Sequence, residues 1–163
     1  MDQLAKQILK DFSLDDIEPK ARQTGPRNPL DHWSPAILLE RAAYLKKMAK
    51  YGDGSANEML REYPQHRVML LFRSRDGEAE VHQDFADLFC VLAGTATLVT
   101  GGTVARARTV EHGETRGDSI DGGKRQELKA GDFVHVPAGL PHQMLVAGEK
   151  SVTCLVMKIQ EVV

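Results

Sequence analysis

The sequence predicts an all-β domain, a small barrel or sandwich, with a helical extension at its N-terminal side. From Val68 onward, short apolar runs of strand length alternate with turns rich in glycine, aspartate and glutamate, a pattern typical of sandwiches and barrels. The pattern contains neither βαβ alternation nor an internal repeat. With 163 residues, of which 42% are hydrophobic, the chain is long enough to bury one core.

The first third of the chain has helical spacing. Leu4, Ile8 and Leu9 lie where one face of a helix would carry them. Residues 13–33 are interrupted by three prolines and one glycine and are expected to form an arm or linker. Ser34-Pro35 then supplies an N-cap serine and a proline at the first helical position, which predicts a second helix.

That second helix is expected to continue to Tyr51, because apolar residues keep helical spacing up to there and Gly52 can end it. Ser55 and Glu58 have the spacing of a capping box and predict a further short helix through Glu62. We therefore divide the chain into an N-terminal helical extension and arm, residues 1–62, and a barrel domain, residues 63–163.

The barrel domain is expected to consist of short strands. The polar, glycine-rich segment 111–124 is expected to be a loop near the barrel mouth. The predicted strands are Val68–Phe72, Ala79–Asp84, Asp87–Leu92, Thr95–Thr100, Thr103–Val110, Gln126–Leu128, Phe133–Val136, Gln143–Val146 and Val152–Ile159.

The most informative motif runs from Gly131 to His142 and reads G-D-F-V-H-V-P-A-G-L-P-H. It predicts a short strand, a tight turn and a histidine directly after the turn. Proline fixes its own φ and glycine adopts backbone angles that other residues avoid, so such a turn is well defined. A histidine held by this turn points in a fixed direction, as a metal ligand must.

This run resembles the second conserved motif of the cupin superfamily and matches it position for position. The first cupin motif has two histidines, a glutamate and a glycine, and residues 80–94 resemble it more loosely. Here His82, Asp87 and Gly94 take the places of the second histidine, the glutamate and the glycine. Glu80 takes the place of the first histidine. The resemblance covers residues 66–160 and implies a double-stranded β-helix, or jelly roll.

The resemblance also implies a divalent metal ion bound by His82, Asp87 and His142, with Glu80 as a further ligand. A second alignment puts His82 and Asp84 in the places of the two histidines, so Asp84 is the alternative to Glu80, but it leaves one residue too few before Asp87. Two imidazoles with one or two carboxylates suit Fe, Mn, Ni, Zn or Co.

Strand parity gives a condition for this site. Glu80 and His82 are two residues apart and share a face of an extended strand, whereas Asp87 needs a turn at 85–86 to face the same way. His135 lies on the strand that enters the second motif's turn. If it faces inward, it is a candidate catalytic base or substrate contact; the alternative is a half-buried strand histidine without such a role.

The resemblance implies that the barrel binds a small organic molecule such as an organic acid. The residues do not decide between an enzyme, of dioxygenase, isomerase or lyase type, and a non-catalytic ligand-binding or sensor protein. Many cupins are dimers, so the resemblance also implies a homodimer.

Charge and hydropathy exclude other partner classes. The net charge of −2 provides no electrostatic basis for binding nucleic acid or an anionic membrane surface. No apolar run approaches the roughly 20 residues that span a bilayer. The first residues lack the basic start and apolar centre of a signal peptide, so we expect a cytoplasmic protein.

Overall fold

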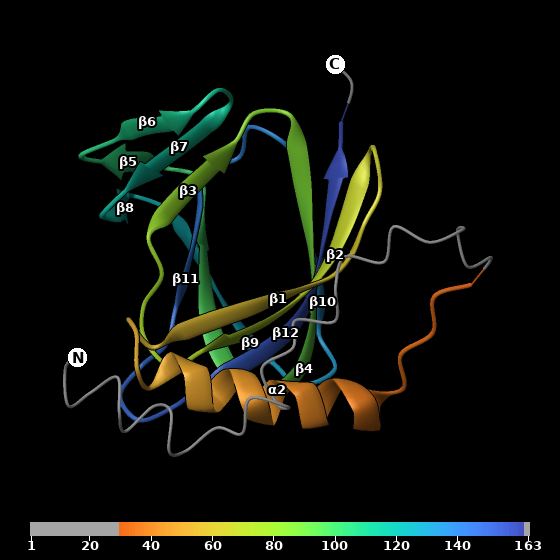
Figure 1. Cartoon of the computed structure of the whole chain (residues 1–163). Coiled ribbons are helices and arrows are strands. Elements are labelled where there is room, and N and C mark those ends of the chain that lie inside the picture. The colour runs from red at the N-terminus through yellow and green to blue at the C-terminus, as the bar shows by residue number, and fades with distance from the viewer. Residues whose placement is uncertain (1–29, 162–163) are drawn as a thin grey trace, which may run out of the picture. The chain divides into compact units, whose positions relative to one another are not determined.

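The computed structural model describes residues 30–161, and residues 33–161 belong to one unit (Figure 1). In this unit one helix precedes a series of antiparallel strands, which curl into the double-stranded β-helix that the motifs predicted. The helix predicted around Leu4–Leu9 lies outside the described residues. The elements are α2 (Pro35–Ala49), β1 (Ser55–Glu62), β2 (His66–Arg73), β3 (Ala79–His82), β4 (Phe85–Thr100), β5 (Thr103–Ala105), β6 (Arg108–Glu111), β7 (Glu114–Gly117), β8 (Ser119–Asp121), β9 (Lys124–Lys129), β10 (Phe133–Val136), β11 (His142–Leu145) and β12 (Val152–Gln160).

The long strand β4 belongs to both faces of the barrel. Its first half pairs with β10 and β12, and its second half pairs with β9 and β11. Between the halves lies Gly94, with a φ of 78°. A Cβ at this position would stand 1.9 Å from the carbonyl oxygen of Ser151. The bend therefore requires glycine, both for its backbone angle and for the close approach of β12.

The two faces of β2 serve two different cores. Leu70 and Phe72 pack with the buried face of α2, whereas Met69 and Leu71 pack against the cluster that fills the barrel. Alternate residues of one strand point to opposite sides, so the helix covers the outside of the sheet (Figure 1). The barrel cluster consists of Phe89, Val91, Ala96, Leu98, Leu128, Val136, Met144, Val146, Val152, Cys154 and Val156.

The helix predicted after Ser34 is confirmed. The Ser34 hydroxyl accepts a hydrogen bond from the Ile37 backbone N–H at 3.3 Å, and Pro35 is the first helical residue. The helix ends at Ala49, with Lys50 as its C-cap, two residues before the predicted end at Tyr51.

The short helix predicted from Ser55 to Glu62 is wrong, because these residues form β1. This strand pairs with β2 along its length, and Glu58 binds the Arg41 side chain of α2, with 2.9 Å between Nε and Oε2. Ala56 and Leu60 pack against the helix core. Hydrogen-bonded pairing with β2 and packing against the helix core outweigh the weak local preference of these residues for helix.

Two predictions about the strands also need correction. The segment 111–124 is not a loop: it contains β7 and β8, whose polar, partly exposed residues show no apolar alternation. The single strand predicted over Thr103–Val110 is two strands, because the chain turns at Arg106, which has a φ of 49°.

The predicted boundary between residues 62 and 63 stays a prediction; within the described unit, β1 lies in the same sheet as β2. Among residues 30–161, no helix is long and apolar enough to cross a membrane.

Replacing Gly94 by alanine tests the bend of β4. Gly101 is the matched control, because its φ of 73° is similar but a Cβ there would meet open space. We expect Gly101→Ala to lower the free energy of unfolding by about 1–2 kcal/mol, the cost of a left-handed backbone, and Gly94→Ala to lower it by at least about 3 kcal/mol, since the clash with Ser151 is added. Urea denaturation measures both; equal losses would contradict the steric argument.

Candidate metal centre

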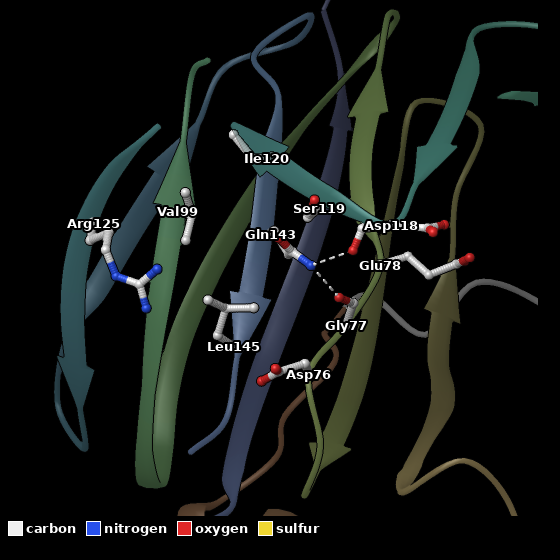
Figure 2. A pocket seen from close by; sticks show the side chains of 10 residues that line it. All are labelled: Asp76, Gly77, Glu78, Val99, Asp118, Ser119, Ile120, Arg125, Gln143 and Leu145. Carbon is white, nitrogen blue, oxygen red and sulfur yellow. Dashed lines mark hydrogen bonds between the residues drawn. The ribbon is translucent and has the colours of Figure 1, made fainter. Parts of the chain in front are cut away.

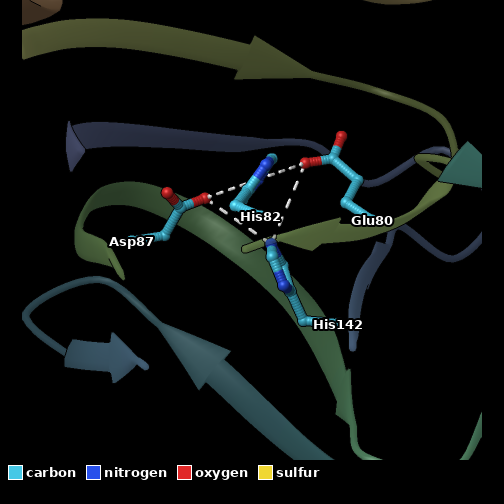
Figure 3. Close-up of side chains that lie close together, drawn as sticks. All are labelled: Glu80, His82, Asp87 and His142. Atoms are coloured by element: carbon cyan, nitrogen blue, oxygen red, sulfur yellow. Dashed lines mark ion pairs between the residues drawn. The ribbon is translucent and has the colours of Figure 1, made fainter. Parts of the chain in front are cut away.

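Strand register brings four side chains to one place inside the barrel (Figure 3). Glu80 and His82 lie on β3, two residues apart and on the same face. His142, the first residue of β11, pairs directly with Glu80 across the two strands. Asp87 comes from the start of β4. Figure 3 shows the four side chains pointing toward one another.

A hydrogen bond between the two motifs holds this arrangement. The backbone N–H of Gly139, in the Pro/Gly turn before His142, donates to the carbonyl oxygen of His82 at 2.7 Å. The turn that reorients Asp87 is a bend at 83–84, not at 85–86 as predicted, since Phe85 already begins β4. This bend carries the chain from the sheet of β3 to the sheet that holds the start of β4, so parity along one strand no longer applies.

The spacing of the four groups fits a common ion. Nε2 of His82 lies 3.2 Å from Oε2 of Glu80 and 3.3 Å from Oδ2 of Asp87. Nε2 of His142 lies 3.5 Å from the same Asp87 oxygen and 3.8 Å from the same Glu80 oxygen. Atoms bound to one ion at about 2.1 Å stand roughly 3.0–3.4 Å apart. The four residues thus form a group that could hold a metal ion.

His142 has the tautomer that a metal ligand needs. Its Nδ1 lies 3.1 Å from the carbonyl oxygen of Leu140, which can only accept, so Nδ1 carries the proton. Nε2 is buried and has no hydrogen-bond partner. A buried nitrogen with an unused lone pair, directed at two carboxylates, is explained by a cation between them.

His82 is oriented by a carboxylate. Its Nδ1 lies 2.6 Å from Oε2 of Glu114 on β7, so its Nε2 faces the cluster. A carboxylate behind a ligating histidine fixes the ring and raises its basicity. Arg116, also on β7, pairs with Glu80 at 2.6 Å. Both residues come from the segment predicted to be a loop, where the sequence had indicated only their proximity to the barrel mouth.

Lys158 is part of the cluster, and the sequence analysis missed it. This β12 residue pairs directly with Asp87 on β4. Its Nζ lies 2.7 and 2.9 Å from the two carboxylate oxygens of Asp87 and 2.8 Å from Nε2 of His82. The alternation of residues along β12 could have indicated it. Val152, Cys154 and Val156 face the core, and Lys158 is the next residue of the same alternation.

The cluster strongly favours positive charge. Burial raises the pKa of Glu80, but the hydrogen bond to His82 and the charge of Arg116 outweigh it and hold the pKa at about 2. Burial would also raise the pKa of Asp87, yet the nearby imidazoles of His142 and His82 and the charge of Lys158 keep it far below its ordinary value. Both groups are therefore carboxylates at neutral pH.

The same carboxylates act on His82. Burial lowers its pKa, but the hydrogen bonds to Asp87 and Glu80 outweigh burial and the opposing charge of Lys158, and raise the pKa to about 9. A proton on Nε2 would face the Lys158 ammonium at 2.8 Å, so the two cannot occupy this position together. Imidazolium and ammonium compete for the same negative charge.

Two predicted site residues lie outside the cluster. Asp84 is exposed in the bend after β3, near Gly113, while Glu80 faces the two histidines. His135 on β10 is exposed, and its Nε2 lies 3.7 Å from Glu161, so it does not face the barrel interior.

Two cavities lie near the cluster. The smaller, of about 40 Å³, is lined by Glu80 and His142 together with residues of the barrel interior. The larger, of about 470 Å³, adjoins it through Gly77 and Gln143. Figure 2 shows Gln143 donating from Nε2 to the carbonyl oxygens of Gly77, at 2.8 Å, and Asp118, at 3.1 Å. None of the four clustered residues lines the larger cavity.

Comparison with known proteins agrees with the fold. The sequence profile described as a cupin domain matches residues 106–158. The fold is similar to that of TT1209 from Thermus thermophilus, with a TM-score of 0.51 and 17% identity over 71% of this chain and 93% of that one. It is also similar to the polyketide cyclase RemF from Streptomyces resistomycificus, with a TM-score of 0.50 and 17% identity over 66% of each chain, slightly under two thirds of the cyclase. No curated protein sequence matches the chain.

A pair of substitutions tests which carboxylate completes the group. Glu80→Gln removes a charge from the cluster, whereas Asp84→Asn removes one from the exposed bend next to it. We expect Glu80→Gln to weaken Co(II) or Zn(II) binding at least tenfold, by analogy with the loss of supporting metal-site groups, and Asp84→Asn to leave it unchanged. Competition with a chromogenic chelator measures the affinity; the reverse order would assign the role to Asp84.

Proposed function

Because the chain belongs to the cupin superfamily, we propose that it is a metal-binding cupin whose barrel takes a small organic molecule, such as an organic acid. The observation that carries the proposal is the buried, unpartnered Nε2 of His142, which faces the carboxylates of Asp87 and Glu80. Without a cation, an unprotonated Nε2 would lose a hydrogen bond to water and would direct its lone pair at two carboxylates.

His82, His142 and Asp87 would hold the ion, with Glu80 as a further ligand. This mixed set of nitrogen and oxygen donors suits Fe, Mn, Ni, Zn or Co. Bound there, the ion would supply Lewis acidity to an organic ligand, and two carboxylates would moderate that acidity. Reactions of dioxygenase, isomerase or lyase type, the homodimer and the cytoplasmic location stay predictions from the sequence.

The protein's own residues prepare the centre. Glu114 and the Leu140 carbonyl hold the two imidazoles with Nε2 directed inward. Phe89 lies against the His142 ring, with 6.4 Å between centroids, and excludes water from that side. The carboxylates keep their charge because their pKa values are lowered, so the donor set is ready without prior loss of a proton from Glu80 or Asp87.

Titration of metal-free protein with Fe(II), Mn(II), Co(II), Ni(II) and Zn(II) tests the proposal. We expect one ion per chain, and a melting temperature that rises with ion concentration, because binding to the native state alone stabilises it. His142→Ala should abolish this rise, and His135→Ala, whose ring lies outside the cluster, should not. If no ion binds at millimolar concentration, the metal proposal is wrong.

The position of Lys158 supports a second candidate function, a metal-free ligand-binding protein. The ammonium already neutralises Asp87 and satisfies Nε2 of His82, two of the groups that a metal would use. A metal ion can enter only if this ammonium leaves. Its side chain is 17% exposed, compared with 3% for Asp87, and its four-carbon stem is flexible, so withdrawal needs no change of the strands.

Substitution of Lys158 by methionine distinguishes the two candidates. If the ammonium competes with a metal ion, Lys158→Met should raise metal affinity about tenfold or more, while the metal-free variant melts at a lower temperature because Asp87 loses a buried partner. Lys150→Met, in an exposed turn, is the control for loss of charge alone. Calorimetric titration gives the affinity. Unchanged affinity in Lys158→Met would rule out competition at this position.

A further inference from the structure

Arg73 is a charged residue at a position of β2 that faces the barrel interior. Along this strand Met69 and Leu71 pack against the barrel core, and Arg73 is next in the same alternation. An apolar residue would be expected there, since guanidinium groups are costly to bury without partners.

The Arg73 guanidinium has no anionic partner among the residues that the structure describes. Its Nε is buried and makes no hydrogen bond, and among residues 30–161 it forms no ion pair. The neighbouring carboxylates are engaged elsewhere: Glu78 pairs with Arg108, and Glu80 pairs with Arg116 and His82. A buried donor of this kind requires an explanation beyond packing.

The cavity beside the metal cluster provides the space for a missing partner. Arg73 lines it together with His142 and Glu80 of the cluster, with Glu78, and with the apolar side chains of Leu71 and Phe89. Its volume of about 40 Å³ exceeds the roughly 10–15 Å³ needed for one water, and is of the size of a carboxylate group.

Gly77 keeps this side of the guanidinium open. A Cβ at Gly77 would stand 3.0 Å from both Cζ and Nη1 of Arg73, closer than side chains ordinarily pack. Gly77 lines both cavities, so the absence of a side chain there leaves space beside the guanidinium.

We propose that Arg73 receives the carboxylate of a small organic acid, the rest of which extends toward the metal cluster. The planar guanidinium presents paired N–H donors that match a carboxylate, in contrast to the single-point charge of a lysine. Leu71 and Phe89 strengthen this pairing by excluding water. The two carboxylates that line the cavity repel an anion less because Glu78 pairs with Arg108 and Glu80 with Arg116. An organic acid is thus the ligand class for the proposed function. Only the contact between the far end of the acid and the metal rests on that function; the pairing with Arg73 does not.

Acetate is the probe, and acetamide, which has nearly the same shape but no charge, is the control ligand. Chelator-treated, metal-free protein is titrated with each and followed by NMR at the side chains of the cavity, Phe89 and Met144. We expect saturable shifts with acetate and none with acetamide at equal concentration. The arrangement needs no metal, so the failure of metal binding and the failure of this inference can be observed separately.

Three variants test whether the acetate binds at Arg73. Arg73→Met should weaken acetate binding at least tenfold, and Arg73→Lys should restore only part of it because the fork is lost. Arg67→Met is the control on the same strand, where the guanidinium instead lies over the Phe85 ring at 5.1 Å, and should bind acetate normally. The melting temperature of Arg73→Met should not fall, because an unpartnered buried polar group is removed, so loss of binding is not loss of fold.

Equal acetate binding by Arg73→Met and the unchanged protein would overturn the inference. So would equal binding of acetate and acetamide, or no acetate binding at 50 mM (about 50 times a weak, millimolar dissociation constant). Loss of binding in Lys158→Met, with Arg73→Met unaffected, would place the anion at the metal cluster instead and would equally overturn it.

Discussion

The continuity of β4 through both faces of the barrel is the constraint on which the site depends. This strand pairs with β12 and β10 before its bend at Gly94 and with β11 and β9 after it. Its register with β12 sets Lys158 opposite Asp87. Its register with β11 places His142, which β11 in turn aligns with Glu80 on β3. A shift of one residue in either pairing would turn these side chains away from the interior.

The cluster is organised around competition for one position between carboxylates. Asp87 and Glu80 attract a proton on His82, the ammonium of Lys158 or, in the proposed function, a metal ion, and only one cation can lie within bonding distance of all the groups. In the structure the ammonium of Lys158 contacts two of these groups, Asp87 and His82. Burial makes each of these interactions stronger than it would be in water. Exchange of one cation for another therefore changes the free energy of unfolding, which links the stability of the fold to ligand binding.

The barrel interior is otherwise apolar, which gives its few polar groups their significance. Met69 and Leu71 on β2, and Val152, Cys154 and Val156 on β12, form ordinary core positions. Each of these two alternations ends in a basic residue, Arg73 and Lys158. Lys158 is paired with Asp87, whereas Arg73 has no anionic partner within residues 30–161.

The sequence by itself determined the fold class, the second motif's turn and the helix after Ser34. Its family resemblance indicated His82, Asp87 and His142, with Glu80 or Asp84, as a candidate group. These features depend on local spacing, on turn residues and on a motif, all of which can be read from residues that are close together in the sequence. Only the tertiary structure decided that 55–62 is a strand, that Glu80 rather than Asp84 faces the histidines, and that Lys158, Glu114 and Arg73 belong to the interior. Those outcomes depend on pairings between strands far apart in the chain, for which local preference carries no information.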